Sequence, residues 1–279
     1  MKNILVPTDF SATAENAARY ALHLADQINA PKIILYNAYQ APVALDPMAM
    51  APAVLLLDEE QLRTSSMEAL EHFKEELKKD CPQNCSIELF CEYALLNNGL
   101  DHVCEKTDSD LIVMGITGGG LLEETLIGSN TIAVSKHSTK PVIIVPKDAR
   151  FNKIEKVALA CDFKSVIDTT PVEPIRNLLE ETSAKLMVLN IDHTHQHFDP
   201  EIPFQSKMLD QLFHSYYPEY HFIDQIDFME GVHRFVLENK IDLLITIPKK
   251  HGFFDQLFHR SHTKQMAFHV HVPLMIVHD

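Results

Sequence analysis

The most informative part of the chain reads Met114-Gly115-Ile-Thr-Gly118-Gly-Gly-Leu-Leu-Glu-Glu-Thr-Leu-Ile-Gly128-Ser129-Asn130 and directly follows the apolar run Leu111–Met114. Five of the eight glycines lie between positions 115 and 128. Glycines after a buried strand let backbone amides approach an anion closely, and a helix N-terminus adds unpaired N–H groups and a favourable dipole. No lysine completes a G-x-x-x-x-G-K-[ST] motif. The pattern predicts a phosphate-binding segment between a strand and a helix.

Similar apolar runs precede and follow this segment. Their β-branched and leucine content, without strict alternation, predicts strands of a parallel sheet that are buried on both faces. The predicted strands are Ile4–Val6, Ile33–Tyr36, Ile87–Phe90, Leu111–Met114 and Val142–Val145. Helical spacing of apolar residues predicts helices over Ser11–Ile28, Glu59–Lys79, Ala94–Lys106 and Ser129–His137, with Ser11 as the N-cap of the first.

The second half of the chain repeats this order. Asp9 recurs as Asp162, an offset of 153 (162 − 9), and Asp110 recurs as Asp242, an offset of 132 (242 − 110). A duplication accounts for both offsets if the second copy is shorter in its middle. The prediction is an α/β fold of two doubly wound, five-stranded parallel-sheet domains in tandem, spanning 1–147 and 152–279.

Each copy ends in an apolar strand, Val142–Val145 in the first and Leu274–Val277 in the second. An apolar strand left at the edge of a sheet invites aggregation. We therefore expect the two terminal strands to pair with each other inside the chain. The same surface also leaves a homodimer open as an alternative assembly.

Composition narrows the class of protein. A net charge of −15 argues against a nucleic-acid partner, because nonspecific affinity for nucleic acid comes from clustered Lys and Arg. The apolar runs are too short to span a bilayer, and the N-terminus shows no signal-peptide core, so we expect a cytoplasmic protein without membrane contact. The five cysteines are then expected as reduced thiols.

The spacing Gly115-x2-Gly118-x9-Gly128-Ser129 resembles the signature of the ATP-binding branch of the universal stress protein family. The opening Ile4-Leu-Val-Pro7-Thr8-Asp9-Phe-Ser is similar to that family's first strand, and Thr139-Lys-Pro-Val-Ile-Ile-Val-Pro146 to its last. The resemblance implies the strand order 3-2-1-4-5 in each copy. It also implies an adenine nucleotide as the ligand: ATP, or AMP or ADP, with Mg²⁺ as an optional companion.

The resemblance also implies the site residues. Asp9 would touch the nucleoside, Ala38 would line the adenine pocket through its backbone, and the glycines with the following hydroxyl would hold ribose and phosphates. The full set expected to bind the nucleotide is Pro7, Thr8, Asp9, Ala38, Met114, Gly115, Gly118, Gly128, Ser129 and Asn130. Strands 1 and 4 would lie side by side, which places Asp9 and Gly115 at the topological switch point where open α/β sheets bind ligands.

The second copy departs from the signature, because Ile247, Lys250 and Arg260 stand where the first has Gly115, Gly118 and Gly128. We expect a degenerate site that serves in domain pairing, within a stress-response protein that binds one nucleotide. A slow ATP hydrolase and a nucleotide-regulated interaction or carrier protein are the alternatives. The sequence shows no catalytic constellation, so catalysis beyond weak ATPase activity is not expected.

Two segments lie outside this account. His193, His195 and His197 alternate after the second copy's second strand and could share Zn²⁺ if the segment were extended. A solvated polar loop is the explanation we favour, so no metal ligand is assigned. Gln40–Leu57, rich in Pro, Ala and Met, is expected as a surface loop or a partly helical excursion, and such long loops are often lids or interfaces.

Overall fold

The computed structural model describes residues 3–40, 43–44, 53–54, 58–116, 128–192, 201–248 and 272–278. Within these ranges the predicted strands and helices are confirmed. The first half contains β1 (Asn3–Pro7), α1 (Ala12–Ile28), β2 (Lys32–Tyr39), α2 (Glu59–Leu77), η1 (Lys78–Asp80), β5 (Ser86–Tyr93), α3 (Leu96–Thr107), β6 (Leu111–Gly115), α4 (Ser129–His137) and β7 (Val142–Val145).

The second half follows the same order, with its first helix in two pieces. It contains β8 (Lys156–Ala160), α5 (Val166–Thr169), α6 (Val172–Thr182), β9 (Lys185–Asp192), α7 (Ile202–Phe213), η2 (His214–Tyr216), β10 (Glu219–Asp224), α8 (Phe228–Asn239), β11 (Leu243–Thr246) and β12 (Leu274–Ile276).

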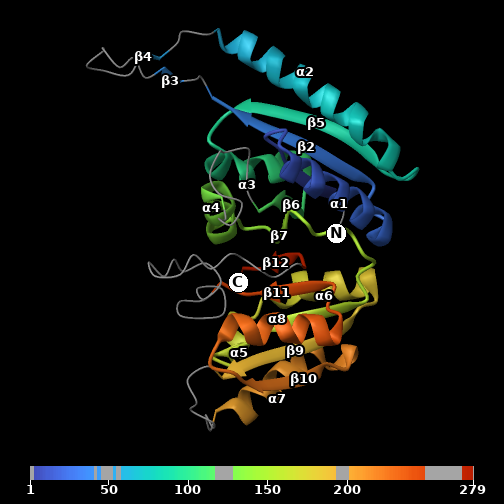
Figure 1. Ribbon diagram of the computed structural model, residues 1–279, viewed down its shortest axis with the longest axis vertical. Helices are drawn as coiled ribbons and strands as arrows, with labels where there is room; N and C mark the ends of the chain where they lie inside the picture. Colours follow the sequence, from blue (N-terminus) through green and yellow to red (C-terminus); the bar gives the residue numbers. More distant parts are fainter. Residues whose placement is uncertain are drawn as a thin grey trace.

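These strands form one sheet in the order β10-β9-β8-β11-β12-β7-β6-β1-β2-β5. Numbered within its own half, each set of five strands has the order 3-2-1-4-5, so the expected fold of two tandem doubly wound domains is confirmed. The first domain lies above the second in Figure 1, with β7 and β12 side by side at their junction. Within this sheet, the strands of each domain pair in parallel.

Both faces of the sheet are covered by helices. The side chains of Ile4 and Val6 in β1 pack into the cluster that contains apolar residues of α1, α2, α6 and α7. The intervening Leu5 packs into the opposite cluster, with residues of α3, α4 and α8. All three residues are fully buried, because alternate side chains of a strand point to opposite faces. The continuous apolar runs in the sequence are the consequence.

The two domains join through β7 and β12, as the sequence predicted. Here the pairing is antiparallel, with Ile143 opposite Met275 and Ile144 opposite Leu274. Ile143 and Met275 are fully buried. Burying one such side chain contributes about 1.5–3 kcal/mol, so the junction has the character of a core rather than of a surface contact.

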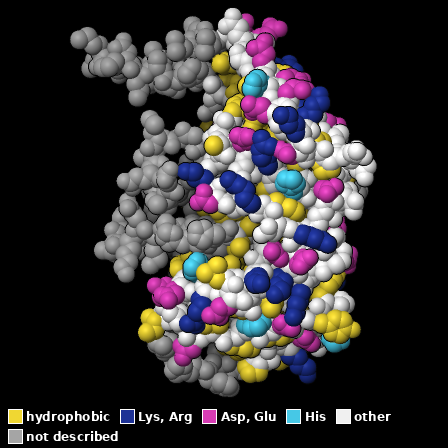
Figure 2. All heavy atoms as spheres, turned by 45° about the vertical axis from the view of Figure 1, so that its right-hand side comes forward, with side chains coloured by type: hydrophobic (Ala, Val, Ile, Leu, Met, Phe, Trp, Pro, Cys, Tyr) yellow, Lys and Arg dark blue, Asp and Glu magenta, His cyan; other side chains and the backbone are white. Residues whose placement is uncertain are grey.

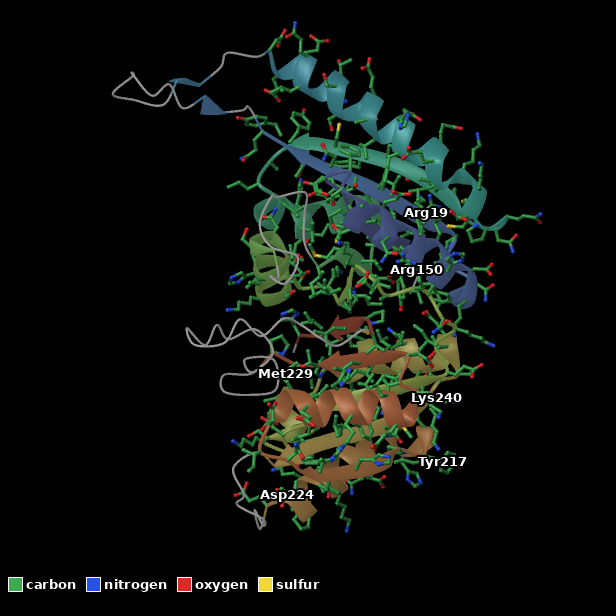
Figure 3. All side chains as sticks on the ribbon, in the orientation of Figure 1. Arg19, Arg150, Tyr217, Asp224, Met229 and Lys240 are labelled. Atoms are coloured by element: carbon green, nitrogen blue, oxygen red, sulfur yellow. The ribbon has the colours of Figure 1, made fainter. Side chains whose placement is uncertain are left out.

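The segment between the domains is bound to α1. The side chain of Asn16 donates to the carbonyls of Pro146 (3.1 Å) and Ala149 (2.9 Å). Arg150, labelled in Figure 3, donates to the Asn16 side-chain oxygen at 2.6 Å. Further along α1, Gln27 donates to the Ile154 carbonyl (2.9 Å) and accepts from its amide (2.8 Å). These bonds hold the interdomain segment against the first domain.

The long segment Gln40–Leu57 is only partly described. Val43–Ala44 (β3) and Ala53–Val54 (β4) pair as two short antiparallel strands. These four residues are therefore extended, where one of our two sequence interpretations was a partly helical excursion. Among the helices that the structure describes, none combines the length and apolar character needed to cross a bilayer.

Replacing Gln27 by Ala tests the interdomain segment. The change removes the side-chain hydrogen-bond partner of both the amide and the carbonyl of Ile154, a fully buried residue. A buried backbone group left without a hydrogen bond lowers the free energy of unfolding by about 1–3 kcal/mol. Urea unfolding should show this loss for Gln27→Ala. The control is Gln83→Ala at an exposed turn, expected within about 0.5 kcal/mol of the unmodified protein. Equal midpoints for the two variants would contradict the assignment.

Candidate functional site

The carboxyl ends of β1 and β6 form the candidate site. β1 pairs with β2 on one side and with β6 on the other. The helix after β1 packs on one face of the sheet, and the helix after β6 packs on the opposite face. This is the topological switch point at which open α/β sheets bind ligands.

The turn after β1 is held by four hydrogen bonds. Thr8 donates its amide to the Tyr36 carbonyl at 2.8 Å, and its own carbonyl accepts from the Asn37 side chain at 2.8 Å. The Thr8 hydroxyl oxygen accepts from the Phe10 amide at 3.0 Å, and a carboxylate oxygen of Asp9 accepts from the Ser11 amide at 3.1 Å. Thr8 is buried and Asp9 is exposed. The turn therefore presents the Asp9 carboxylate at the edge of the sheet.

The start of α1 lies against the end of β6. A side-chain carbon added at Gly115 would meet the carbonyl oxygen of Thr13 at 2.8 Å and its carbonyl carbon at 3.0 Å. Ordinary Cβ contacts are longer, so residue 115 must be glycine for α1 to begin where it does. This requirement comes from packing inside the protein and adds to the ligand-binding role that the sequence predicted. Met114, one residue earlier, is buried in the core.

The start of α4 is tied to the same strand end. The Gly128 amide donates to the Ile116 carbonyl at 2.9 Å, and the Thr131 hydroxyl lies 3.1 Å from the carbonyls of both Gly115 and Ile116. Gly128 is the N-cap, and glycine has no side chain with which to cap the helix. The amides of residues 129–131 lie in the first turn, where no intrahelical carbonyl can accept from them. An anion is attracted to such a helix end.

The remaining predicted residues lie at this edge or outside the described ranges. Pro7 ends β1 opposite Tyr36, and Ala38 lies near the end of β2, partly buried and packed against the α3 side of the core. Ser129 and Asn130 are exposed in the first turn of α4. Gly118 lies outside the described residues. The structure thus brings the described part of the set to one edge of the sheet.

Three residues that organise the site were missed by sequence reasoning: Thr13, Asn37 and Thr131. Only Asn37 could have been found from the sequence, because it is repeated in the second copy. Asn190 follows Asn37 at the same offset of 153 (190 − 37) that relates Asp9 to Asp162. The other two act through contacts between α1, β6 and α4, which no local pattern reveals.

The turn after the first strand of the second domain has four equivalent hydrogen bonds. Cys161 donates its amide to the Leu189 carbonyl at 2.9 Å and accepts from the Asn190 side chain at 2.8 Å. Its sulfur accepts from the Phe163 amide at 3.3 Å, and Asp162 accepts from the Lys164 amide at 3.1 Å. Cys161 therefore replaces Thr8 without changing the turn.

The switch point of the second domain differs. Ile247, at the position of Gly115, is 7% exposed, so a buried branched side chain stands where the first domain has a glycine packed against Thr13. The first helix is interrupted between α5 and α6 at Thr170-Pro171, where proline lacks an amide for the helix. Lys250, Arg260 and Ser261 lie outside the described residues, as do His193, His195 and His197. Among the residues that are described, no group of three potential ligands could hold a metal ion.

Comparisons with known proteins give the family. Residues 1–146 match the model of the universal stress protein family. Two universal stress proteins of Methanocaldococcus jannaschii are similar: MJ0531, 30% identical with 52% of this chain and 82% of that protein covered, and MJ0577, 26% identical with 52% and 95% covered. A universal stress protein structure from Archaeoglobus fulgidus covers 99% of this chain and 98% of its own, with a TM-score of 0.70 at 14% identity, which supports the fold of both domains.

Replacing Gly115 by Ala tests the contact between α1 and β6. The added carbon meets backbone atoms, which cannot move aside, and we expect a destabilisation of about 1–3 kcal/mol in thermal or urea unfolding. Gly231→Ala in α8 is the control, because a side-chain carbon there meets only side-chain atoms, the closest at 3.2 Å. Alanine also favours a helix, so that variant should be at least as stable as the unmodified protein. If Gly115→Ala leaves the stability unchanged, α1 can move away from β6 to accommodate the added carbon.

Proposed function

The chain belongs to the universal stress protein family, and we propose that its first domain binds one adenine nucleotide, ATP or else ADP or AMP, as part of a stress response. Mg²⁺ would accompany the polyphosphate forms. Under this proposal the first domain spans residues 1–147 and the second spans residues 152–279. The second domain binds no nucleotide and serves as a structural partner of the first. We place the protein in the cytoplasm, where the thiols of its five cysteines would stay reduced.

The single observation that carries the proposal is the uncapped N-terminus of α4 beside the end of β6. Gly128 has no side chain to accept from the first amides of α4, and Thr131 and Gly128 anchor that helix end to the strand through Gly115 and Ile116. A helix N-terminus at a switch point suits phosphate groups. The glycine-rich stretch that precedes Gly128 in sequence supports the same ligand.

The other end of the site suits a nucleoside. Asp9 is exposed on a turn whose hydrogen bonds hold its backbone, and a carboxylate there can accept hydrogen bonds from ribose hydroxyls. By contrast, α1 begins with a side-chain cap, because the Ser11 hydroxyl accepts from the Ala14 amide at 3.3 Å. The two helix ends at this edge therefore differ, and we assign the phosphates to α4.

The electrostatics agree with a small anion held by backbone amides rather than with a polyanion. The net charge is −15, and on the face shown in Figure 2 the Lys and Arg side chains are interspersed with Asp and Glu. A nucleic acid requires clustered positive charge, whereas a nucleotide can be held by a few oriented dipoles.

Replacing Gly128 by Asp separates binding from folding. The backbone at Gly128 is extended (φ −61°, ψ 145°), which aspartate adopts readily, and its carboxylate would cap α4 and repel phosphate. We expect ATP affinity to fall at least about tenfold, or about 1.4 kcal/mol, by calorimetric titration. Stability should be unchanged or should rise by a few tenths of a kcal/mol.

The matched control is Leu95→Asp. Leu95 is the exposed N-cap of α3 and makes no side-chain cap, so this variant adds the same charge at another helix start of the same domain. Its ATP affinity should stay within about threefold, less than about 1 kcal/mol. If both variants bind ATP as the unmodified protein does, the phosphates do not lie at α4.

A second measurement counts the sites. Because Ile247 fills the position of Gly115, equilibrium dialysis should give one ATP per chain, and two equivalent sites would refute the degenerate second domain. The same samples, incubated with Mg²⁺, distinguish binding from the alternative of slow ATP hydrolysis. Release of phosphate beyond one equivalent per chain would favour the hydrolase.

A further inference from the structure

Two cysteines flank the turn that leads from η1 into β5. The Cys81 amide donates to the Lys78 carbonyl at 3.4 Å, and this bond closes the end of η1. The Cys85 amide donates to the Pro82 carbonyl at 3.1 Å, and this bond closes the turn. The next residue, Ser86, begins β5 and donates its amide to the Pro31 carbonyl at 2.9 Å. The backbone is therefore bonded on both sides of the cysteine pair.

The Cys81 thiol points toward Cys85 across this turn. It donates to the carbonyl oxygen of Cys85 at 3.3 Å, and the Cys85 thiol donates to the carbonyl of the next residue, Ser86, at 3.8 Å. Both side chains are partly buried against the same hydrophobic core, on the α1 and α2 side of the sheet. The Cys81 thiol is thus already directed at the residue with which it would form a disulfide bond.

An ion pair holds the residue that directly precedes Cys81. Asp80, directly before Cys81, forms an ion pair with Arg19 of α1, which is labelled in Figure 3. Arg19 also binds Glu15 one turn earlier, at 2.8 Å. The Asp80 carboxylate is thus neutralised by a partner rather than left as an unpaired charge beside the neighbouring thiol.

We propose that Cys81 and Cys85 are a redox modification site that forms a reversible intramolecular disulfide when the protein meets a peroxide. The Cys81 thiolate attacks one peroxide oxygen, the O–O bond breaks, and the leaving oxygen departs as water or an alcohol after protonation. The resulting sulfenic acid is attacked by the Cys85 sulfur, which forms the S–S bond and releases water. Both thiols are oxidised by two electrons in total, and the peroxide is reduced.

The order of attack follows from the surroundings of the two thiols. Burial raises the pKa of Cys81, while the hydrogen bond with Cys85 and the charge of Lys74 act in the opposite direction. Burial and, to a smaller extent, the neighbouring Cys81 raise the pKa of Cys85 to about 11. Cys81 therefore ionises first and is the nucleophile. Because both thiols are protonated at neutral pH, the reaction is slow and needs sustained oxidant.

Cys104 provides an internal standard. Its side chain is 1% exposed, and burial raises its pKa to about 12, so it should stay unmodified under conditions that oxidise the turn. Cys91, in β5, is partly buried and serves as the control position for substitution.

The test is peptide mass spectrometry of the full chain after treatment with hydrogen peroxide, alkylation of free thiols and cleavage after glutamate. Glu76 and Glu88 bracket a peptide that contains Cys81 and Cys85, whereas Cys91 and Cys104 fall in other peptides. The peptide 77–88 should escape alkylation and lose about 2 Da, the mass of two hydrogens, and dithiothreitol should restore it. Cys91→Ser should behave like the unmodified protein.

Cys81→Ser should abolish the disulfide, and Cys85→Ser should instead accumulate a sulfenic acid at Cys81 that a sulfenic-acid reagent traps. Thermal melts of both variants confirm that the fold is retained. The proposal is overturned if peptide 77–88 remains fully alkylated while Cys91 or Cys104 is oxidised. It is also overturned if Cys81 pairs with another cysteine or with a second chain. None of these readouts depends on nucleotide binding.

Discussion

The antiparallel pairing of β7 with β12 is the contact on which the rest of the molecule depends. It turns two five-stranded sheets into one sheet of ten strands and removes two apolar edges from solvent. Because both strands belong to one chain, the pairing is intramolecular and does not depend on protein concentration. It also places His278, which follows β12, 3.0 Å from the Ser135 carbonyl in α4. The second domain thereby touches the helix whose opposite end forms the candidate phosphate site.

Helix α1 connects the separate features of the first domain. Its first turn packs against Gly115. Asn16, near its start, and Gln27, at its C-terminal end, both bind the interdomain segment. Arg19, on the same helix, pairs with the residue before Cys81. The candidate site, the interdomain segment and the cysteine pair therefore all contact the same helix. A shift of α1 would affect all three together.

A comparison of the two domains shows which parts of the candidate site are structural. The turn after the first strand keeps the same four hydrogen bonds in both domains, although Cys161 replaces Thr8. The position at the end of the fourth strand has diverged, from Gly115 to the buried Ile247. The turn is needed to lead the chain from strand to helix whether or not a ligand binds. The glycine permits the close approach of α1 in the first domain, and the second domain has an interrupted helix in its place.

Much of this was determined by the sequence alone, because helix and strand periodicities are local. Strand and helix positions, the Ser11 cap, the duplication and the joining of the terminal strands were all predicted, and the resemblance implied the strand order. Only the tertiary structure decided the antiparallel direction and register of β7 and β12, the contact of Thr13 with Gly115, and the hydrogen bond of the Cys81 thiol to the Cys85 carbonyl. Each of these depends on where backbone and side-chain atoms meet in space. A pattern of residue types specifies which face of an element is buried, but not which atom of a distant segment lies against it.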